Sequence, residues 1–184
     1  MEDIAQRYRR LAEAFNATVD AVPDDRWDSP SPCEEWSARD VVAHVVETQG
    51  IFLGLVGRQL GDIPAVDDAP GAAARAATNQ TQAGLDDPRR ATEEFDGHFG
   101  RSTYEQAVDR FLSFDLVIHR WDLARAAGLD DELAPDDVAR LRDTAQGFGD
   151  ALRESGACGP ALEPPPGADE QTRLLAFLGR KAWA

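Results

Sequence analysis

Two helical segments of the sequence carry side chains that could bind a metal or move a proton. In FDLVIHRWDLARAAG, residues 114–128, Asp115 and His119 are four residues apart and therefore project from one face of a helix. On a helical wheel His119 lies at about 40° from Asp115, among apolar residues. The charged residues Asp109, Arg110 and Arg120 fall on the opposite half. An ionised carboxylate on a buried face is costly without a partner, so Asp115 needs a cation, a proton or hydrogen bonds.

The pair of Asp115 and His119 has three interpretations. It is a hydrogen-bonded pair satisfied inside the core, or a catalytic dyad in which Asp115 orients His119 for a nucleophile. Alternatively, the two side chains are ligands of a metal whose other ligands come from neighbouring helices. No serine or cysteine is obviously placed to complete a dyad. The pair alone leaves all three interpretations open.

A second histidine, His44, favours the metal interpretation. It shares a helical stripe with residues that we expect to face the core, namely Val41, Thr48, Ile51 and Leu55. His44, Asp115 and His119 together form a set of two histidines and one carboxylate, which leaves positions on a metal open for water or substrate. The sequence therefore predicts that these three side chains converge between two helices.

Other polar side chains near these motifs each have two interpretations. Glu47 and Asp122 lie one turn from the histidines, where they either support the ligands and a substrate or face solvent. His98, in the glycine-flanked FDGHFG, is a surface residue or a substrate contact. For Cys33, packing against the start of the second helix is favoured over a nucleophilic role. No catalytic residue is identified from the sequence.

Helical periodicity predicts an all-α protein, a four-helix bundle with short extra helices. The main helices are expected over residues 2–22, 38–59, 103–127 and 135–154, with short helices at 70–85 and 169–180. Ser37 and Asp40 form an N-terminal capping box, and Gly128 ends the third main helix. Trp36 and Trp121 are expected to pack in the bundle or at its edge. No stretch shows convincing β-alternation, and the length suits one domain over 1–184.

Composition excludes several classes of partner. The 184 residues include 34 acidic and 19 basic side chains, for a net charge of −15. Such a surface repels nucleic acid and anionic lipid, and no basic cluster interrupts it. The sequence contains no apolar run long enough to span a membrane and no secretion signal, so a cytoplasmic location is expected. The two cysteines, Cys33 and Cys158, are far apart and form no C-x-x-C motif.

The same motifs resemble a known family. SPCEEWSARDVVAHVVETQ (31–49) resembles the PC-x-x-W-x-x-R-D-h-x-x-H segment, with h apolar, of the DinB-like metal-binding superfamily. The similar branch is the N-terminal domain of mycothiol-dependent maleylpyruvate isomerase and its single-domain actinobacterial relatives. FDLVIHRWDLARAAG resembles the D-x-x-x-H-x-WDLA-x-A-x-G segment of that branch, and LLAFLGRKAW (174–183) resembles its C-terminal LLAFLGR. The resemblance spans nearly the whole chain.

The resemblance implies a divalent metal held between helices by His44, Asp115 and His119. Zinc is the expected metal and nickel the alternative. Two departures stand out: the isomerase has glutamate where this chain has Asp115, and it carries a further C-terminal domain that completes its active site. Activity on maleylpyruvate is therefore not implied.

The implied activity is thiol-dependent transfer or isomerisation, in which a low-molecular-weight thiol such as mycothiol meets a small electrophile. The alternatives are a non-catalytic metal-binding or sensor module and a metal-dependent hydrolase. The resemblance also implies a homodimer, for which the sequence offers Val117 and Trp121 on the outer side of the third main helix.

Overall fold

A computed structural model of the chain describes residues 2–97, 100–149, 151–154, 156 and 158–183. Helices make up most of this part of the chain, which confirms the predicted all-α class. The chain divides into two compact units, Met1–Asp131 and Glu132–Ala184. The single domain expected over 1–184 stays a prediction.

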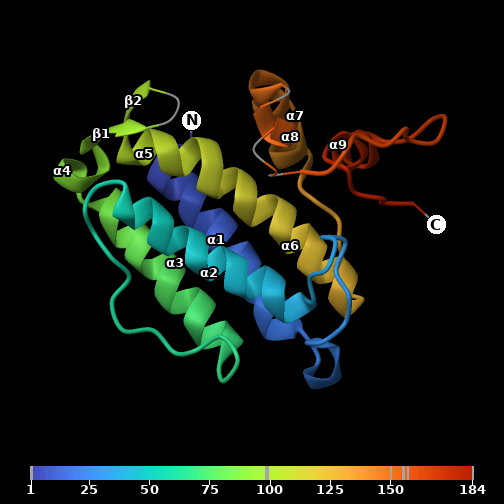
Figure 1. Ribbon diagram of the computed structural model, residues 1–184, viewed down its shortest axis with the longest axis horizontal. Coiled ribbons are helices and arrows are strands. Elements are labelled where there is room, and N and C mark those ends of the chain that lie inside the picture. Colours follow the sequence, from blue (N-terminus) through green and yellow to red (C-terminus); the bar gives the residue numbers. More distant parts are fainter. Residues whose placement is uncertain (1, 98–99, 150, 155, 157, 184) are drawn as a thin grey trace. The chain divides into compact units, whose positions relative to one another are not determined.

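Four helices of the first unit form a bundle. They are α1 (Ile4–Ala21), α2 (Ala38–Gly54), α3 (Pro70–Asp86) and α6 (Ser113–Ala127). Both α1 and α2 pack against α3 and α6, so the four helices form a closed ring (Figure 1). The core between them includes the fully buried Tyr8, Phe15, Val41 and Leu123.

The helix that carries His44 begins as predicted but ends earlier. Ser37 and Asp40 form the expected capping box at the start of α2. The predicted end at Gln59 is wrong, because α2 stops at Gly54. Gly57 has a φ of 70°, a left-handed conformation that terminates helices, and the Arg58 N–H then donates to the Leu53 carbonyl at 3.0 Å.

The fourth helix of the bundle is α3, not the segment 135–154. We expected 70–85 to be a short accessory helix, but α3 packs against both α1 and α2. Its buried face is built from small residues, with Ala73, Ala74 and Ala77 fully buried, so its apolar periodicity is weak in the sequence. Segment 135–154 lies in the second unit as α7 (Pro135–Phe148) and α8 (Ala151–Glu154).

The segment predicted as one helix over 103–127 contains a π-helical turn. It consists of α5 (Tyr104–Ala107), the π turn η2 (Val108–Leu112) and α6, which ends at Gly128 as predicted. A π turn holds an extra residue, so positions before it slip around the axis relative to those after it. Accordingly Asp109, expected on the solvent half, forms an ion pair with the buried Arg7 of α1.

The helix α6, which contains Asp115 and His119, is buried around most of its circumference. Val117 is 4% exposed and Trp121 is fully buried, so their predicted place on an outer face is wrong. Trp121 packs in the core, which was one of the two places expected for it. These two side chains therefore offer no exposed surface to a second copy of the chain.

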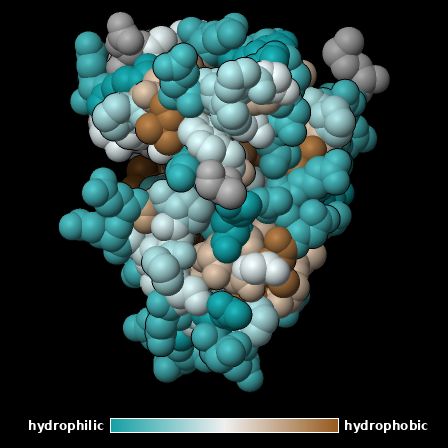
Figure 2. All heavy atoms as spheres, turned by 90° about the vertical axis from the view of Figure 1, so that its right-hand side faces the viewer, coloured by the Kyte–Doolittle hydropathy of each residue, from teal (hydrophilic) through white to brown (hydrophobic). Residues whose placement is uncertain are grey.

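Shorter elements complete the described chain. They are η1 (Asp24–Arg26), α4 (Pro88–Ala91), β1 (Glu94–Gly97), β2 (Gly100–Thr103) and α9 (Glu170–Phe177). β1 and β2 pair antiparallel, with Glu94 opposite Thr103, although no β-alternation was recognised in the sequence. No described helix is long and apolar enough to cross a membrane. On the face drawn in Figure 2, hydrophilic residues predominate and hydrophobic residues show only in small patches.

A buried amide in the bundle allows a stability test. Gln49 is fully buried, and its Oε1 accepts hydrogen bonds from the hydroxyls of Tyr8 at 2.5 Å and Thr81 at 2.9 Å. Replacing Gln49 by Leu leaves both hydroxyls without this acceptor and should lower the free energy of unfolding by about 2–4 kcal/mol in urea denaturation. The same change at the exposed Gln59 should alter it by less than about 0.5 kcal/mol. Equal effects at both positions would contradict the role of this network.

Candidate metal centre

Contacts between α2 and α6 run in antiparallel order along one seam. The rings of Phe52 and Phe111 lie 5.9 Å apart at one end. Thr48 and His44 both reach Asp115 in the middle, at 3.3 Å and 3.5 Å. Earlier residues of α2 therefore contact later residues of the segment formed by η2 and α6. The seam brings residues more than 60 positions apart in the sequence into one cluster.

The three ligand candidates converge on one carboxylate oxygen. Asp115 Oδ1 lies 3.1 Å from His119 Nε2 and 3.5 Å from His44 Nε2. The ligand-type atoms of all three residues lie within 4.8 Å of one another. The predicted convergence of His44, Asp115 and His119 is therefore observed, between α2 and α6.

The cluster is open on one side and closed on the other. The side chains of His44 and Asp115 are 30% and 22% exposed, whereas that of His119 is 8% exposed. Trp36 closes part of the cluster, because its ring centroid lies 4.8 Å from that of His44 and 5.8 Å from that of His119. A small ligand can approach from the side of His44 and Asp115.

Behind His119, a buried acid sets the orientation of the ring. Asp122 is fully buried, and its Oδ2 lies 3.0 Å from His119 Nδ1. The Cys33 thiol donates to the same oxygen at 3.2 Å. With Nδ1–H donating to Asp122, the Nε2 lone pair of a neutral His119 points toward Asp115 and His44, as it must in a metal ligand.

The loop before α2 places Cys33 and Trp36 at the cluster. The Ser31 N–H donates to the Trp36 carbonyl at 2.8 Å, and the Trp36 N–H donates to the Cys33 carbonyl at 3.1 Å. Glu35, between them, has a φ of 67°, the only positive φ at a non-glycine residue in the described chain. A positive φ is strained for a non-glycine residue, and this one immediately precedes Trp36, whose ring lies against both histidines.

Sequence reasoning identified the three converging side chains but not all of their neighbours. It assigned packing to Cys33 and Trp36 and no role to Thr48, whose spacing of four residues from His44 was the available signal. Glu47 is exposed at the edge of α2. His98 lies outside the described residues, so its predicted role as a substrate contact is not located.

Asp115 and His119 shift each other's pKa in opposite directions. Burial opposes ionisation of Asp115, but the charge of His119 and hydrogen bonds from both histidines outweigh it and lower the pKa of the carboxyl below its ordinary value. Burial likewise opposes protonation of His119, but the charge of Asp115 outweighs it and raises the pKa of the imidazole well above its ordinary value. Both shifts favour the ionised forms of Asp115 and His119, paired with each other.

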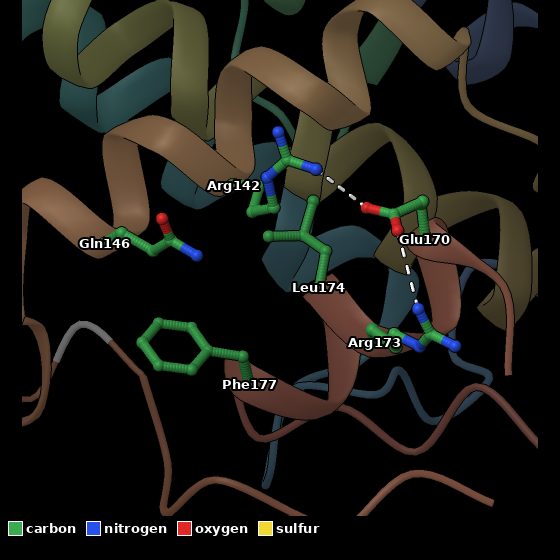
Figure 3. A pocket seen from close by; sticks show the side chains of 6 residues that line it. All are labelled: Arg142, Gln146, Glu170, Arg173, Leu174 and Phe177. Atoms are coloured by element: carbon green, nitrogen blue, oxygen red, sulfur yellow. Dashed lines mark hydrogen bonds and ion pairs between the residues drawn. The ribbon is translucent and has the colours of Figure 1, made fainter. Parts of the chain in front are cut away.

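The second unit holds a different depression, with a volume of about 450 Å³. Its lining residues are Arg142, Gln146, Glu170, Arg173, Leu174 and Phe177 (Figure 3). Glu170 lies between the two arginines, 2.8 Å from Arg142 and 3.5 Å from Arg173. These charges are exposed and paired with one another, and none of the six lining residues is a histidine or cysteine. The seam in the first unit is therefore the better site for chemistry.

All residues of the seam cluster lie in a segment that matches a known family. Residues 8–124 match the family described as mycothiol maleylpyruvate isomerase N-terminal domain. The chain belongs to this family. Members of this family are typically metal-binding, which agrees with the donor set of His44, Asp115 and His119.

Two relatives from Mycobacterium tuberculosis extend the similarity to the whole chain. They are Uncharacterized protein MT0763 of strain CDC 1551 / Oshkosh and Uncharacterized protein Rv0738 of strain ATCC 25618 / H37Rv. Each is 31% identical over 189 residues, covering 97% of this chain and 98% of the relative. No solved structure matches the chain.

The ion pair predicts how the stability of the metal-free protein depends on pH. The raised pKa of His119 contributes stability that is complete below about pH 6.5, its value in the unfolded chain, and is lost as pH rises through the folded value. The lowered pKa of Asp115 contributes stability above about pH 3.9 that is lost as pH falls. With chelator present, the urea concentration at the unfolding midpoint should decrease as pH rises above about 6.5, and His119→Asn should flatten this slope.

The exposed Glu47→Gln is the matched control and should keep the slope of the wild type. An unchanged slope in His119→Asn would show that His119 is not the group that titrates.

Proposed function

We propose that the seam binds a divalent metal through His44 Nε2, the Asp115 carboxylate and His119 Nε2. The observation that carries the proposal is the meeting of both imidazole nitrogens on one carboxylate oxygen, at 3.1 Å and 3.5 Å. Two nitrogen donors and one oxygen donor suit zinc, with nickel as the alternative. The donor set fits such an ion, because the ring of His119 is already oriented by Asp122 and the cluster has an open side.

The reaction that this site supports best is metal-assisted, thiol-dependent transfer or isomerisation of a small electrophile. When bound, the metal supplies Lewis acidity that lowers the pKa of a coordinated thiol or water. The family membership supports a mycothiol-type thiol as the partner.

Residues around the ligands have separate tasks in this proposal. Asp122 holds the proton of His119 Nδ1, and Cys33 holds Asp122 in place. The Thr48 hydroxyl donates to Asp115 Oδ2 and so fixes the second carboxylate oxygen. The Trp36 ring excludes water from one side of both histidines.

The homodimer and the cytoplasmic location stay predictions, and light scattering at micromolar concentration tests the homodimer.

Metal analysis of the purified protein is the direct test. We expect one equivalent of zinc or nickel, and metal-dependent consumption of mycothiol with a halogenated aromatic electrophile. Turnover of activated esters without thiol would instead favour the hydrolase, and a metal that is bound without any turnover would favour the sensor module. Absence of stoichiometric metal after loading would contradict the proposal.

Removing one ligand separates function from packing. His119→Ala should abolish metal binding and thiol-dependent activity, and it leaves Asp115 half-buried without its strongest partner, at a cost on the order of a few kcal/mol in stability. Replacing Asp115 and His119 together by Leu and Phe should recover stability while the protein stays inactive. Failure of the double variant to fold would show that the pair is chiefly structural. Glu47→Ala should keep both metal binding and stability.

The buried acid behind His119 predicts an indirect effect on metal affinity. Asp122→Asn keeps the side-chain shape but removes the charge that orients and supports the imidazole, so metal affinity should fall about 10-fold to 100-fold. Competition with a chromophoric chelator measures this. Cys33→Ser keeps a donor to Asp122 and should alter the affinity by less than Asp122→Asn does. An unchanged affinity in Asp122→Asn would remove Asp122 from the site.

A further inference from the structure

The helix that carries His44 also exposes two large aliphatic side chains. Ile51 is 55% exposed and Leu55 is 37% exposed, and in the described part of the first unit they are the only large hydrophobic side chains that are exposed. Counted from His44 at about 100° per residue, Ile51 lies at about −20° and Leu55 at about 20°. Both therefore project on the side of α2 that His44 presents to Asp115.

These side chains continue the open side of the metal centre. Thr48 stands between His44 and Ile51 on the same stripe, and its hydroxyl touches Asp115 Oδ2 at 3.3 Å. One turn further on, the half-buried Phe52 meets Phe111 across the seam. At about 1.5 Å per residue, the stripe from Thr48 to Leu55 is about 10 Å long.

The sequence placed Ile51 and Leu55 on a core-facing stripe, and the exposure overturns that expectation. Along this stripe the side chains become more exposed, from the fully buried Val41 to Ile51. The stripe therefore faces the core before the metal centre and solvent beyond it. A single exposed aliphatic side chain is ordinary, but two on one stripe beside a site that binds a small molecule indicate a contact surface.

We propose that Ile51 and Leu55, with Phe52 and Phe111 beside them, bind the apolar body of the electrophile while its reactive atom lies at the metal centre. The proposal rests on the proposed function and adds the substrate class: electrophiles with an extended alkyl or aryl group, because Ile51 and Leu55 lie about 10 Å and about 16 Å along the helix from His44. Continuity of the stripe with the His44 and Asp115 cluster supports this occupant over a macromolecule.

The first test needs neither metal nor turnover. The neutral fluorophore N-phenyl-1-naphthylamine should bind the metal-free protein, and Ile51→Asn with Leu55→Gln should weaken its binding by at least about tenfold. The matched control is Leu162→Gln, because Leu162 is 38% exposed but lies in the second unit. Binding equal to wild type in the double variant, or a loss as large in the control, would overturn the proposal.

The second test reads specificity in the metal-loaded protein. A series of N-alkyl bromoacetamides reacts with the thiol so that a sulfur–carbon bond forms, bromide leaves with its electron pair and the thiol proton passes to solvent. In the wild type kcat/KM should rise about twofold to fourfold per added methylene, and the double variant should lose this rise. A rise that persists in the double variant would overturn the proposal.

Two outcomes separate this proposal from its alternatives. If no thiol-dependent turnover is found but the fluorophore binds and the double variant loses it, the proposed function fails and the apolar surface stands. If light scattering shows a wild-type dimer that the double variant converts to a monomer, the surface is a contact between copies and the proposal is wrong.

Discussion

The structure depends on how the carboxylate of Asp115 is neutralised. Asp115 stands on the helix that is buried most completely, and its Oδ1 meets one histidine from its own helix and one from α2. A carboxylate in this position is tolerated only because cationic or donor groups surround it. The same contact lies where α2 packs against α6, since His44, Thr48 and Trp36 all reach the cluster from α2 or the loop before it. The candidate site is therefore part of the α2–α6 interface of the first unit.

The π turn before α6 adjusts which side chains this helix directs to which neighbour. Inside the turn, Asp109 pairs with Arg7 of α1, and downstream of it Asp115 faces α2. Phe111, inside the turn, packs on Phe52 at the outer end of the seam. Such turns occur often at functional sites, and here one lies immediately before the proposed metal ligands. One continuous helical segment thus serves a structural ion pair and a chemical site.

The candidate ligands could be predicted from the sequence because their geometry is local. Asp115 and His119 share a turn of regular helix, so their common direction does not depend on the rest of the fold. His44 was found by its phase on a well-capped helix. Cys33 and Trp36 were assigned only packing, because their approach to the histidines depends on an irregular loop with a strained Glu35. The helix 70–86 was undervalued because alanines pack closely while contributing little to apolar periodicity, and the π turn has no sequence signal as clear as proline or glycine.

The three candidate ligands come from two helices, and this has a consequence for the rate at which a bound metal would exchange its ligands. The spacing of Asp115 and His119 is set by the pitch of one buried helix, whereas His44 reaches them only while α2 and α6 stay in contact. Small opening motions of packed helices occur in microseconds to milliseconds, far faster than unfolding. If the proposed metal binds there, such a motion would detach His44 alone and leave Asp115 and His119 as its protein ligands. The rate of ligand exchange at the proposed centre would then depend on how often the α2–α6 contact opens, and not on the rate at which the whole bundle unfolds.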